Sequence, residues 1–269
     1  MQSFFSVRDL RLRLSVAAAV AREAGALQRR RFFDRTGVGR AYDFKGHQDY
    51  LTATDTEVER LVRERFSAVF PEDGILGEEE GGDRRDVNWI IDPVDGTANF
   101  ARGIPRFCIS IGLAAANKGE IGVIYQPITD ELFAAATGLG ATLDGEPIRV
   151  SSIDDPDRAS IELGWSNRLP FEAHREIADA IAKLGMRINH FGSGALAMAD
   201  VACGRSDGFI EKHIWPWDVL AGYVLVREAG GVQNDFEDGG RGLIEGNRIL
   251  ASAPGVAGLL SKATGWAAG

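Results

Sequence analysis

Apolar positions in the first part of the chain recur at helical spacing and are separated by polar segments. Residues 10–33 carry apolar side chains every three or four positions, which predicts a long helix with one buried face. The polar, glycine-rich segment 36–48 predicts a loop. A second helix is expected from Thr54, because Thr54 and Glu57 fit a capping box, and it should end at Pro71.

The pattern then changes to short apolar runs, each closed by turn residues. Such runs predict strands, and their short connections predict a largely antiparallel sheet. The dipeptide Asp144-Gly145 predicts another tight hairpin. The expected strands are 89–91, 107–115, 122–126 and 132–136.

The rest of the chain alternates strand-like and helix-like segments. Ser193 is expected to cap one helix, and Pro216 is expected to open another that ends at the glycine pair 230–231. A further helix is expected around 177–184, and strands are expected at 160–163, 186–191, 208–211, 231–232 and 249–253.

The apolar pattern is interrupted near residue 150, where serine and acidic residues cluster. We therefore expect two halves. Residues 1–150 should form an α+β half that binds metal and phosphate, and residues 151–269 an α/β half that completes the site.

Composition limits the function classes. The 269 residues are 45% hydrophobic, which is enough for a sizeable core. The formal net charge of -9 argues against a nucleic-acid backbone as the main partner, although bound cations could still recruit a small anionic substrate.

Location is expected to be cytoplasmic. The first residues are rich in arginine and lack an apolar core, so no signal peptide is expected, and no apolar run approaches the roughly 20 residues of a membrane span. Cys108 and Cys203 form no CxxC pair, which favours buried free thiols in a reducing compartment.

Acidic residues stand at the ends of several apolar or glycine-punctuated segments. These residues are Glu78, Asp92, Asp95 and Asp218. Mg²⁺ prefers oxygen ligands of this kind. If Asp92 ends a strand and a turn follows, its carboxylate and that of Asp95 can face one point, and the Val94 carbonyl can add a backbone oxygen.

Gly96 and Thr97 suit a phosphate. If a helix begins there, their N–H groups point outward at the positive end of the helix dipole. Glycine also permits close approach of the phosphate to the backbone.

Other interpretations of these residues remain open. The sequence DPVDG could be a turn with a capping aspartate, and Asp218 could be a first-turn helix acid. The run Glu78–Glu80 could be a solvated loop, and the residues alone do not say which glutamate points inward.

Taken together, the motifs resemble the inositol monophosphatase family, which belongs to the Mg²⁺-dependent, lithium-sensitive phosphatases that include fructose-1,6-bisphosphatase. The matching stretches are KGHQDYLTATD (45–55), GEE (77–79), WIIDPVDGTANF (89–100) and WDVLAGYVLVREAGG (217–231). The resemblance spans almost the whole chain. It implies the layered αβαβα sugar-phosphatase fold, with an antiparallel sheet in the first half and a mixed sheet in the second.

The resemblance implies two to three Mg²⁺ ions. Glu78, Asp92 and the Val94 carbonyl would bind the first ion. Asp92, Asp95 and Asp218 would bind the second, and a third, weaker ion would lie near Glu78.

The resemblance also implies catalytic roles. Gly96 and Thr97 would hold the phosphate through their amides. Asp55 and Thr97, with Glu78, would orient the attacking water. Lys45 matches a lysine at the mouth of the family's site.

Substrate contacts would come from both halves of the chain. The implied residues are Asp95, Ser166, Gly194, Glu211 and Asp218. Glu211 would recognise substrate hydroxyls, with a surface acid at a strand end as the alternative interpretation.

Departures from the family's pattern occur around these contacts. Trp165 replaces a small residue, Gly194 stands where alanine is common, and HIWPWD (213–218) is bulkier than usual. These departures predict a pocket rim shaped for something other than inositol phosphate. The histidines, which lack metal-ligand spacing, are expected in loops or on the surface and are His47, His174, His190 and His213.

The predicted function is Mg²⁺-dependent hydrolysis of a small polyol phosphate, first of all inositol 1-phosphate, by a metal-activated water without a covalent intermediate. Histidinol phosphate, fructose 1,6-bisphosphate or an adenosine bisphosphate are alternative substrates. A non-catalytic regulator that binds RNA polymerase or ribosomal partners is a second alternative. The family resemblance implies a homodimer, and no nucleic-acid or membrane partner is expected.

Overall fold

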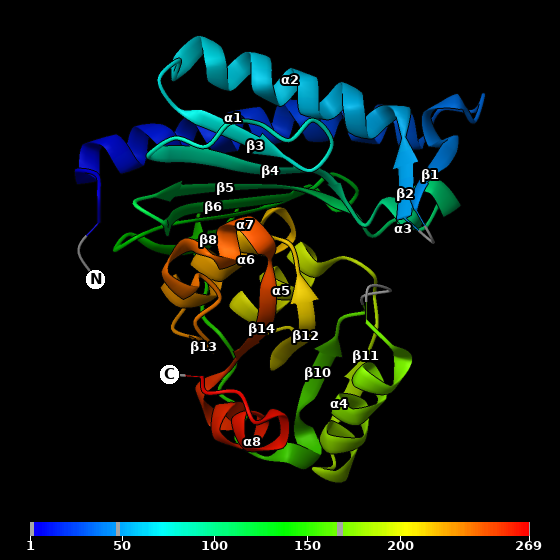
Figure 1. Cartoon of the computed structure of the whole chain (residues 1–269), viewed down its shortest axis with the longest axis vertical. Coiled ribbons are helices and arrows are strands. Elements are labelled where there is room, and N and C mark those ends of the chain that lie inside the picture. The colour runs from blue at the N-terminus through cyan, green and yellow to red at the C-terminus, as the bar shows by residue number, and fades with distance from the viewer. Residues whose placement is uncertain (1–2, 47–48, 166–168, 269) are drawn as a thin grey trace.

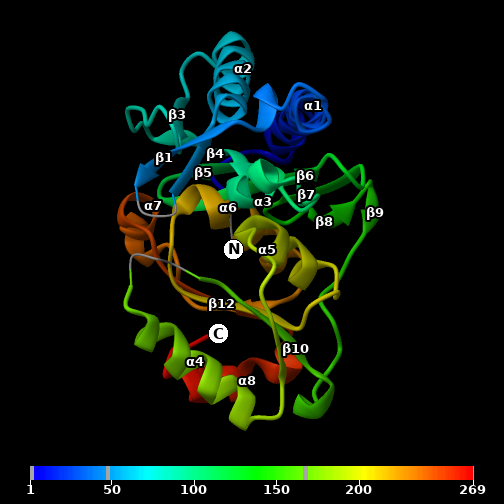
Figure 2. The same cartoon turned by 90° about the vertical axis from the view of Figure 1, so that its right-hand side faces the viewer.

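Helices and sheets alternate in layers through the molecule. The computed structural model describes residues 3–46, 49–165 and 169–268. Helices α1 and α2 cover one face of the first sheet, α5 and α6 lie between the two sheets, and α4 and α8 cover the far face of the second (Figures 1 and 2). The expected αβαβα order is therefore confirmed.

The helices are α1 (Val7–Phe32), α2 (Ala53–Val69), α3 (Thr97–Arg102), α4 (Phe171–Lys183), α5 (Gly194–Ala202), α6 (Pro216–Glu228), α7 (Gly242–Glu245) and α8 (Pro254–Thr264), with 3-10 turns at Val38–Arg40, Pro156–Arg158 and Asp238–Gly240.

The first sheet is antiparallel except at one edge. Its strand order is β3-β4-β5-β6-β7-β8-β9, and only the β3–β4 pair runs parallel among these described strands. The hairpin expected at Asp144-Gly145 joins β8 to β9. The strands are β3 (Gly74–Gly77), β4 (Val87–Asp95), β5 (Cys108–Ala115), β6 (Lys118–Gln126), β7 (Glu131–Ala136), β8 (Gly140–Leu143) and β9 (Glu146–Pro147).

The second sheet is mixed, as expected. Its order is β11-β10-β12-β14-β13, with β10 parallel to both neighbours and β14 antiparallel to both of its own. Its strands are β10 (Ser160–Leu163), β11 (Arg187–Asn189), β12 (Gly208–Ile214), β13 (Val232–Gln233) and β14 (Asn247–Ser252).

The loop expected over 36–48 was wrong in part. Residues Tyr42–Gly46 form strand β1, which pairs with β2 (Asp49–Thr52) in an antiparallel ribbon. Every residue of β1 is exposed, so the strand has no buried face. Tyr42 and Phe44 do alternate with Asp43 and Lys45, but this short alternation lies within a polar, glycine-rich segment that predicted a loop.

The capping box expected at Thr54 and Glu57 was also wrong. Helix α2 begins at Ala53, and Asp55 accepts hydrogen bonds from the backbone N–H and the hydroxyl of Thr52. The Thr54 hydroxyl instead donates to the Gly39 carbonyl at 2.8 Å. Two threonines stand two residues apart here, and tertiary contacts decide which one caps the helix.

The core lies on both faces of the first sheet. Trp89 and Ile91 of β4 point toward α1 and α2, where Trp89 stacks on Phe66 with ring centroids 4.1 Å apart. Ile90 points to the opposite face and joins a cluster that includes Leu220 of α6. This cluster draws on residues before and after 150, so the two halves share a core. The domain boundary near residue 150 stays a prediction.

No helix among the described residues combines the length and apolarity that crossing a membrane requires. Cys108 and Cys203 are free cysteines, the first buried and the second half-buried.

Candidate active site

Two of the predicted acids stand side by side at the ends of parallel strands. Gly77 of β3 pairs with Ile91 of β4, and the Glu78 N–H donates to the Ile91 carbonyl at 3.1 Å. Glu78 and Asp92 each follow this pair directly. Parallel register therefore brings their carboxylates to one edge of the sheet, which also selects Glu78 among the three neighbouring glutamates.

An irregularity in β4 re-aims the residues that follow. The β4–β5 register shifts between Asp92 and Asp95, which is a β-bulge over Pro93 and Val94. Regular strand alternation would send residues three apart to opposite faces, and bulges of this kind redirect side chains near functional sites. The Gln28 amide donates to the Pro93 carbonyl at 2.6 Å and holds the bulge from α1.

Asp218 reaches the same edge from the second half of the chain. It is the third residue of α6, and the Trp215 N–H donates to its carboxylate at 3.3 Å. Ser110, which pairs with Asp92 in the sheet, donates its hydroxyl to the Trp217 carbonyl at 2.9 Å. The first turn of α6 is thereby tied to the strand beside Asp92. Asp218 is a first-turn acid as well as a member of the cluster.

These acids form a concentrated negative centre. Carboxylate oxygens of Glu78, Asp92 and Asp218 all lie within 4.8 Å of one another. Burial, and then the Glu78 charge, raise the pKa of both Asp92 and Asp218 well above the ordinary value. Buried carboxylates that repel one another need a cation, and an all-oxygen set from separate segments suits Mg²⁺.

Lys45 supplies positive charge at the edge of this cluster. Its ammonium donates to Glu78 Oε1 at 2.8 Å and to Glu79 Oε1 at 2.9 Å. Burial lowers the pKa of Lys45, but the charges and hydrogen bonds of the two glutamates outweigh that effect and raise it overall. Burial and the Glu78 charge raise the pKa of Glu79 to about 7.

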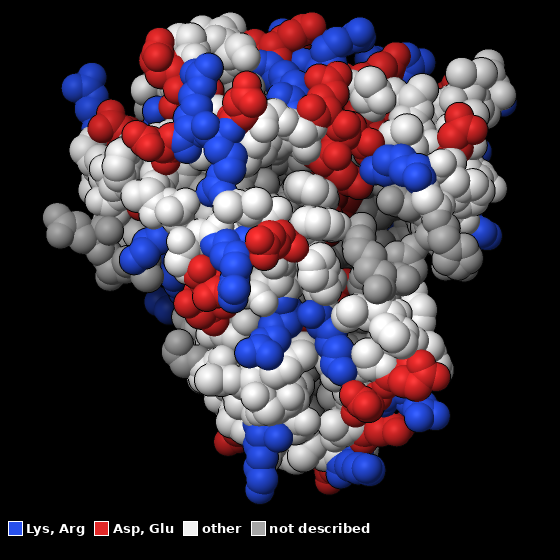
Figure 3. Space-filling model, viewed as in Figure 1, with Lys and Arg blue, Asp and Glu red and all other residues white. Residues whose placement is uncertain are grey.

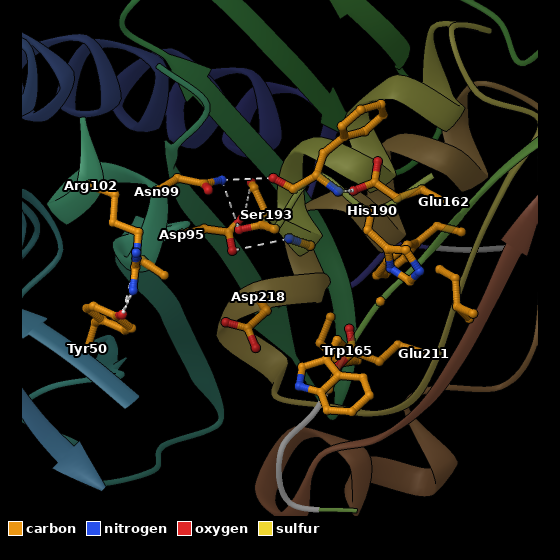
Figure 4. A pocket seen from close by; sticks show the side chains of 18 of the residues that line it. Tyr50, Asp95, Asn99, Arg102, Glu162, Trp165, His190, Ser193, Glu211 and Asp218 are labelled. Atoms are coloured by element: carbon orange, nitrogen blue, oxygen red, sulfur yellow. Dashed lines mark hydrogen bonds between the residues drawn. The ribbon is translucent and has the colours of Figure 1, made fainter. Parts of the chain in front are cut away.

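The Asp95 carboxylate is turned toward helix α5. It accepts hydrogen bonds from the Ser193 hydroxyl and from the N–H groups of Gly194 (3.3 Å) and Ala195 (2.8 Å), as Figure 4 shows in part. Asp95 therefore lies outside the 4.8 Å group. Its charge is nevertheless close enough to raise the pKa of Asp218. The Ser193, Ala195 and Cys108 contacts, the last at 3.6 Å, are all to Oδ2, whereas Oδ1 faces the Gly194 N–H and keeps a lone pair that can face a cation.

The predicted Asp55–Thr97 pair is present. The Thr97 hydroxyl lies 3.2 Å from Asp55 Oδ1 and 2.8 Å from the Val94 carbonyl oxygen, and it can donate to either acceptor. Burial raises the pKa of Asp55 to about 6, although hydrogen bonds from Thr52 oppose the rise.

The segment predicted to bind phosphate, Gly96 and Thr97, lies at a helix start, as expected from the sequence. Helix α3 begins at Thr97, and Gly96 precedes it with φ +94°, a left-handed conformation that favours glycine. A Cβ at Gly96 would also lie 2.9 Å from the Arg106 carbonyl oxygen. The first amides of the helix have no intrahelical acceptors by geometry.

A pocket of about 1030 Å³ opens beside the acids. Asp95 and Asp218 line it, and Figure 4 shows Asp218 between Tyr50 and Trp165. Gly194 and Glu211 line it, as expected for substrate contacts, and Glu211 is buried. Ser166, the remaining predicted contact, lies outside the described residues.

His190 is exposed and lies between β11 and α5, as expected, and it also lines the pocket. His174 of α4 and His213 of β12 differ from expectation, because each lies half-buried in a helix or strand, and His47 lies outside the described residues. His213 contacts the Glu245 carbonyl through Nε2 at 2.9 Å. His213 follows Glu211 in β12 and lies where the β12–β14 register shifts, between Glu211 and Ile214.

Glu59 is a supporting residue that the sequence interpretation missed. This fully buried carboxylate accepts the N–H groups of Glu79 (2.8 Å) and Glu80 (3.1 Å), and Arg63 pairs with it. It thus shapes the turn that presents Glu78. The four-residue spacing of Glu59 and Arg63, next to the buried Val58 position, was the available signal.

Charge is unevenly distributed over the face that Figure 3 shows. Acidic and basic side chains are interspersed on most of it, but one concentration of acidic side chains runs down its upper part. Part of the excess of acidic residues is therefore concentrated in one region of this face.

Comparisons with known proteins agree with this geometry. A model of the inositol monophosphatase family matches residues 9–265. The chain is 37% identical over 252 residues to a protein of Escherichia coli (strain K12) named Nus factor SuhB, covering 90% of this chain and 92% of that protein. It is also 37% identical over 260 residues to the inositol-1-monophosphatase of a Synechocystis species, covering 92% and 87%. The solved structure of inositol monophosphatase from an Anabaena (Nostoc) species superposes with a TM-score of 0.82 at 35% identity, covering 95% and 96%.

Proposed function

The chain belongs to the inositol monophosphatase family, and we propose that it is a Mg²⁺-dependent phosphatase of small phosphate monoesters. Inositol 1-phosphate is the first ester to test. The observation that carries the proposal is the cluster of Glu78, Asp92 and Asp218, which combines mutually repelling buried acids with an adjoining pocket.

The residues fit the expected ions. Glu78, Asp92 and the Val94 carbonyl would hold one Mg²⁺, and Asp92, Asp95 and Asp218 a second, with a third near Glu78. Bound there, the ions would supply the charge that activates a water and stabilises the leaving oxygen.

The chain's own groups would complete the reaction. The amides of Gly96 and Thr97 would hold the phosphate oxygens at the start of α3. Asp55 can accept a hydrogen bond from the Thr97 hydroxyl, and that hydroxyl oxygen would then accept a hydrogen bond from the attacking water, with Glu78 on the other side of the water. No covalent nucleophile is required, because positioning and charge stabilisation suffice for phosphoryl transfer.

Phosphate release from inositol 1-phosphate tests the proposal. Release should require Mg²⁺, should stop when EDTA is added, and should be inhibited by millimolar lithium, as the family resemblance leads us to expect. Full turnover in chelator would exclude the mechanism. Histidinol phosphate, fructose 1,6-bisphosphate and an adenosine bisphosphate complete the panel of substrates.

A second candidate is a regulatory role of the kind that the name Nus factor denotes. The 37% identity to a protein so named favours it. Asp95→Asn separates the two candidates in a cell that depends on this chain. Loss of phosphate release with an unchanged cellular phenotype would support a binding role, and loss of both would support catalysis. A cytoplasmic location and a homodimer are part of the proposal.

A further inference from the structure

The pocket is larger than a phosphate and a small polyol require. Its volume of about 1030 Å³ is at the upper end of the roughly 300–1,000 Å³ typical of small-molecule sites. Asp95 and Asp218 line the part of the pocket where the phosphate would bind. The remaining volume is therefore available to the organic part of the ester.

One wall of this volume is aromatic and comes from the β1–β2 ribbon. Phe44 and Tyr50 line the pocket with ring centroids 4.9 Å apart, and Phe44 is 56% exposed. Tyr42 contacts both rings, at 5.5 Å and 4.9 Å, so the wall is a packed unit. The Arg102 guanidinium lies over the Tyr50 ring at 5.7 Å.

A second aromatic wall comes from the other half of the chain. Trp165 and Phe191 line the pocket and are 46% and 48% exposed. His174 packs against Trp165 at 4.8 Å, and the Arg106 guanidinium lies over the Phe191 ring at 4.8 Å, so each of these two rings is held by its own neighbour. Figure 4 shows Tyr50 on one side of the pocket and Trp165 on the other, with Asp218 between them.

Two carboxylates also line the pocket, on the same side as Trp165 (Figure 4). Glu162 and Glu211 both line the pocket and are buried. Glu162 lies 3.3 Å from an Arg106 guanidinium nitrogen, and Glu211 is placed by β12. Glu162 already accepts the Phe191 N–H at 3.3 Å, and burial raises its pKa to about 7. An ionised carboxylate only accepts hydrogen bonds, so a ligand that reaches Glu211 must present an N–H or O–H donor.

Exposed rings gathered around one pocket indicate a ligand with a complementary surface, because clustered apolar exposure marks binding sites whereas apolar residues exposed singly are ordinary. Aromatic rings favour offset or edge-to-face contact with another ring. We propose that the alcohol part of the substrate carries a planar aromatic ring with an N–H or O–H donor, and that this ring packs against the exposed rings that line the pocket, Phe44 and Tyr50 on one side or Trp165 and Phe191 on the other. The inference rests on the proposed function and narrows the choice among its esters.

Matched esters test this inference. The ring-bearing pair is histidinol phosphate, whose imidazole supplies a donor, and 2-phenylethyl phosphate; the ringless pair is inositol 1-phosphate and glycerol 2-phosphate. We expect kcat/KM for histidinol phosphate to exceed that of both ringless esters by about tenfold or more, with 2-phenylethyl phosphate in between. Equal or better turnover of the ringless pair would overturn the inference.

Wall variants provide the second measurement. Trp165→Ala and Phe44→Ala should each lower kcat/KM for the ring-bearing pair by about 3- to 10-fold while the ringless pair changes by less than about twofold. Phe33→Ala is the matched control, since Phe33 is 58% exposed and lies outside the pocket lining. Equal losses on both pairs would contradict a ring-binding role.

The inference and the proposed function can fail separately. If no ester is hydrolysed with Mg²⁺, the proposed function is wrong, and calorimetric binding of the same esters decides the inference. Tighter binding of the ring-bearing pair that is weakened in Trp165→Ala would support it, and equal binding of both pairs would overturn it.

Discussion

Asp92 occupies the centre of the acidic cluster, and its side chain serves both the fold and the predicted metal. Its Oδ1 accepts the Val94 N–H at 2.9 Å, which an asparagine can also do. We expect Asp92→Asn to lower phosphate release by more than about 100-fold, because a direct ligand should matter more than the supporting residues around a metal site.

The same substitution should not unfold the protein. In EDTA the free energy of unfolding should be unchanged or about 1 kcal/mol higher, because one of several repelling charges is removed. Chemical denaturation of Asp92→Asn beside Asp179→Asn, at an exposed position of α4, measures this. Unfolding of Asp92→Asn alone would show that Asp92 is structural.

The raised pKa values of the buried acids also predict that the stability of the protein depends on pH. In the folded protein the pKa values of Asp92 and Asp218 lie well above the ordinary value, and that of Asp55 rises to about 6, with burial as the first cause in each case. Between the unfolded and folded pKa values the folded protein binds more protons, so its stability falls as pH rises through that window.

Metal-free protein should therefore melt at a higher temperature at about pH 5.5 than at about pH 7.5. This difference in melting temperature should be smaller in Asp92→Asn, which lacks one of the carboxyl groups with a raised pKa. It should also be smaller when Mg²⁺ is added. Thermal melts of both proteins in EDTA check this, and the same pH slope in both would rule out the cluster as its source.

At the scale of elements, a glycine groove in the first sheet positions α6. Gly112 of β5 and Gly122 of β6 are paired neighbours. A Cβ at Gly122 would lie 2.1 Å from the Ala221 carbonyl oxygen, and one at Gly112 would lie 2.9 Å from the Leu220 side chain. The missing side chains let α6 lie close on the sheet, which is how Asp218 reaches β4.

Gly122→Ala should consequently lower both stability and activity. The backbone of α6 must move, and overpacking of this kind costs about 2–3 kcal/mol. Denaturation and initial rates measure the two effects. Gly258→Ala in α8 is the control, because its Cβ would meet open space, and it should be neutral or about 0.5 kcal/mol stabilising. Equal stability of the two variants would mean that α6 does not depend on the groove.

At the scale of the whole molecule, the cluster joins the two halves of the chain. Glu78 and Asp92 come from the first sheet, and Asp218 comes from α6, after residue 150. A cation bound to the folded protein alone stabilises it by about 2.7 kcal/mol at 100 times the dissociation constant. Mg²⁺ should therefore raise the melting temperature relative to EDTA, independently of any turnover.

Thermal melts across a Mg²⁺ titration measure this stabilisation. The shift should saturate with concentration and be reduced in Asp218→Asn, whereas the Asp179→Asn control should behave as wild type. An equal shift in Asp218→Asn would place the cation elsewhere.

The sequence by itself determined the layered fold and the identity of the acids. Apolar runs such as 89–91 and the capping residue Ser193 act through local spacing, so their strands and helix could be predicted, and the motif resemblance supplied the roles that stay predictions. Tertiary structure alone decided which Thr caps α2 and that residues 42–46 pair as β1. It also supplied the physical reason, parallel register beside Ile91, for the Glu78 that the motif resemblance had selected. Those outcomes depend on contacts with other segments, and local periodicity carries no record of such contacts.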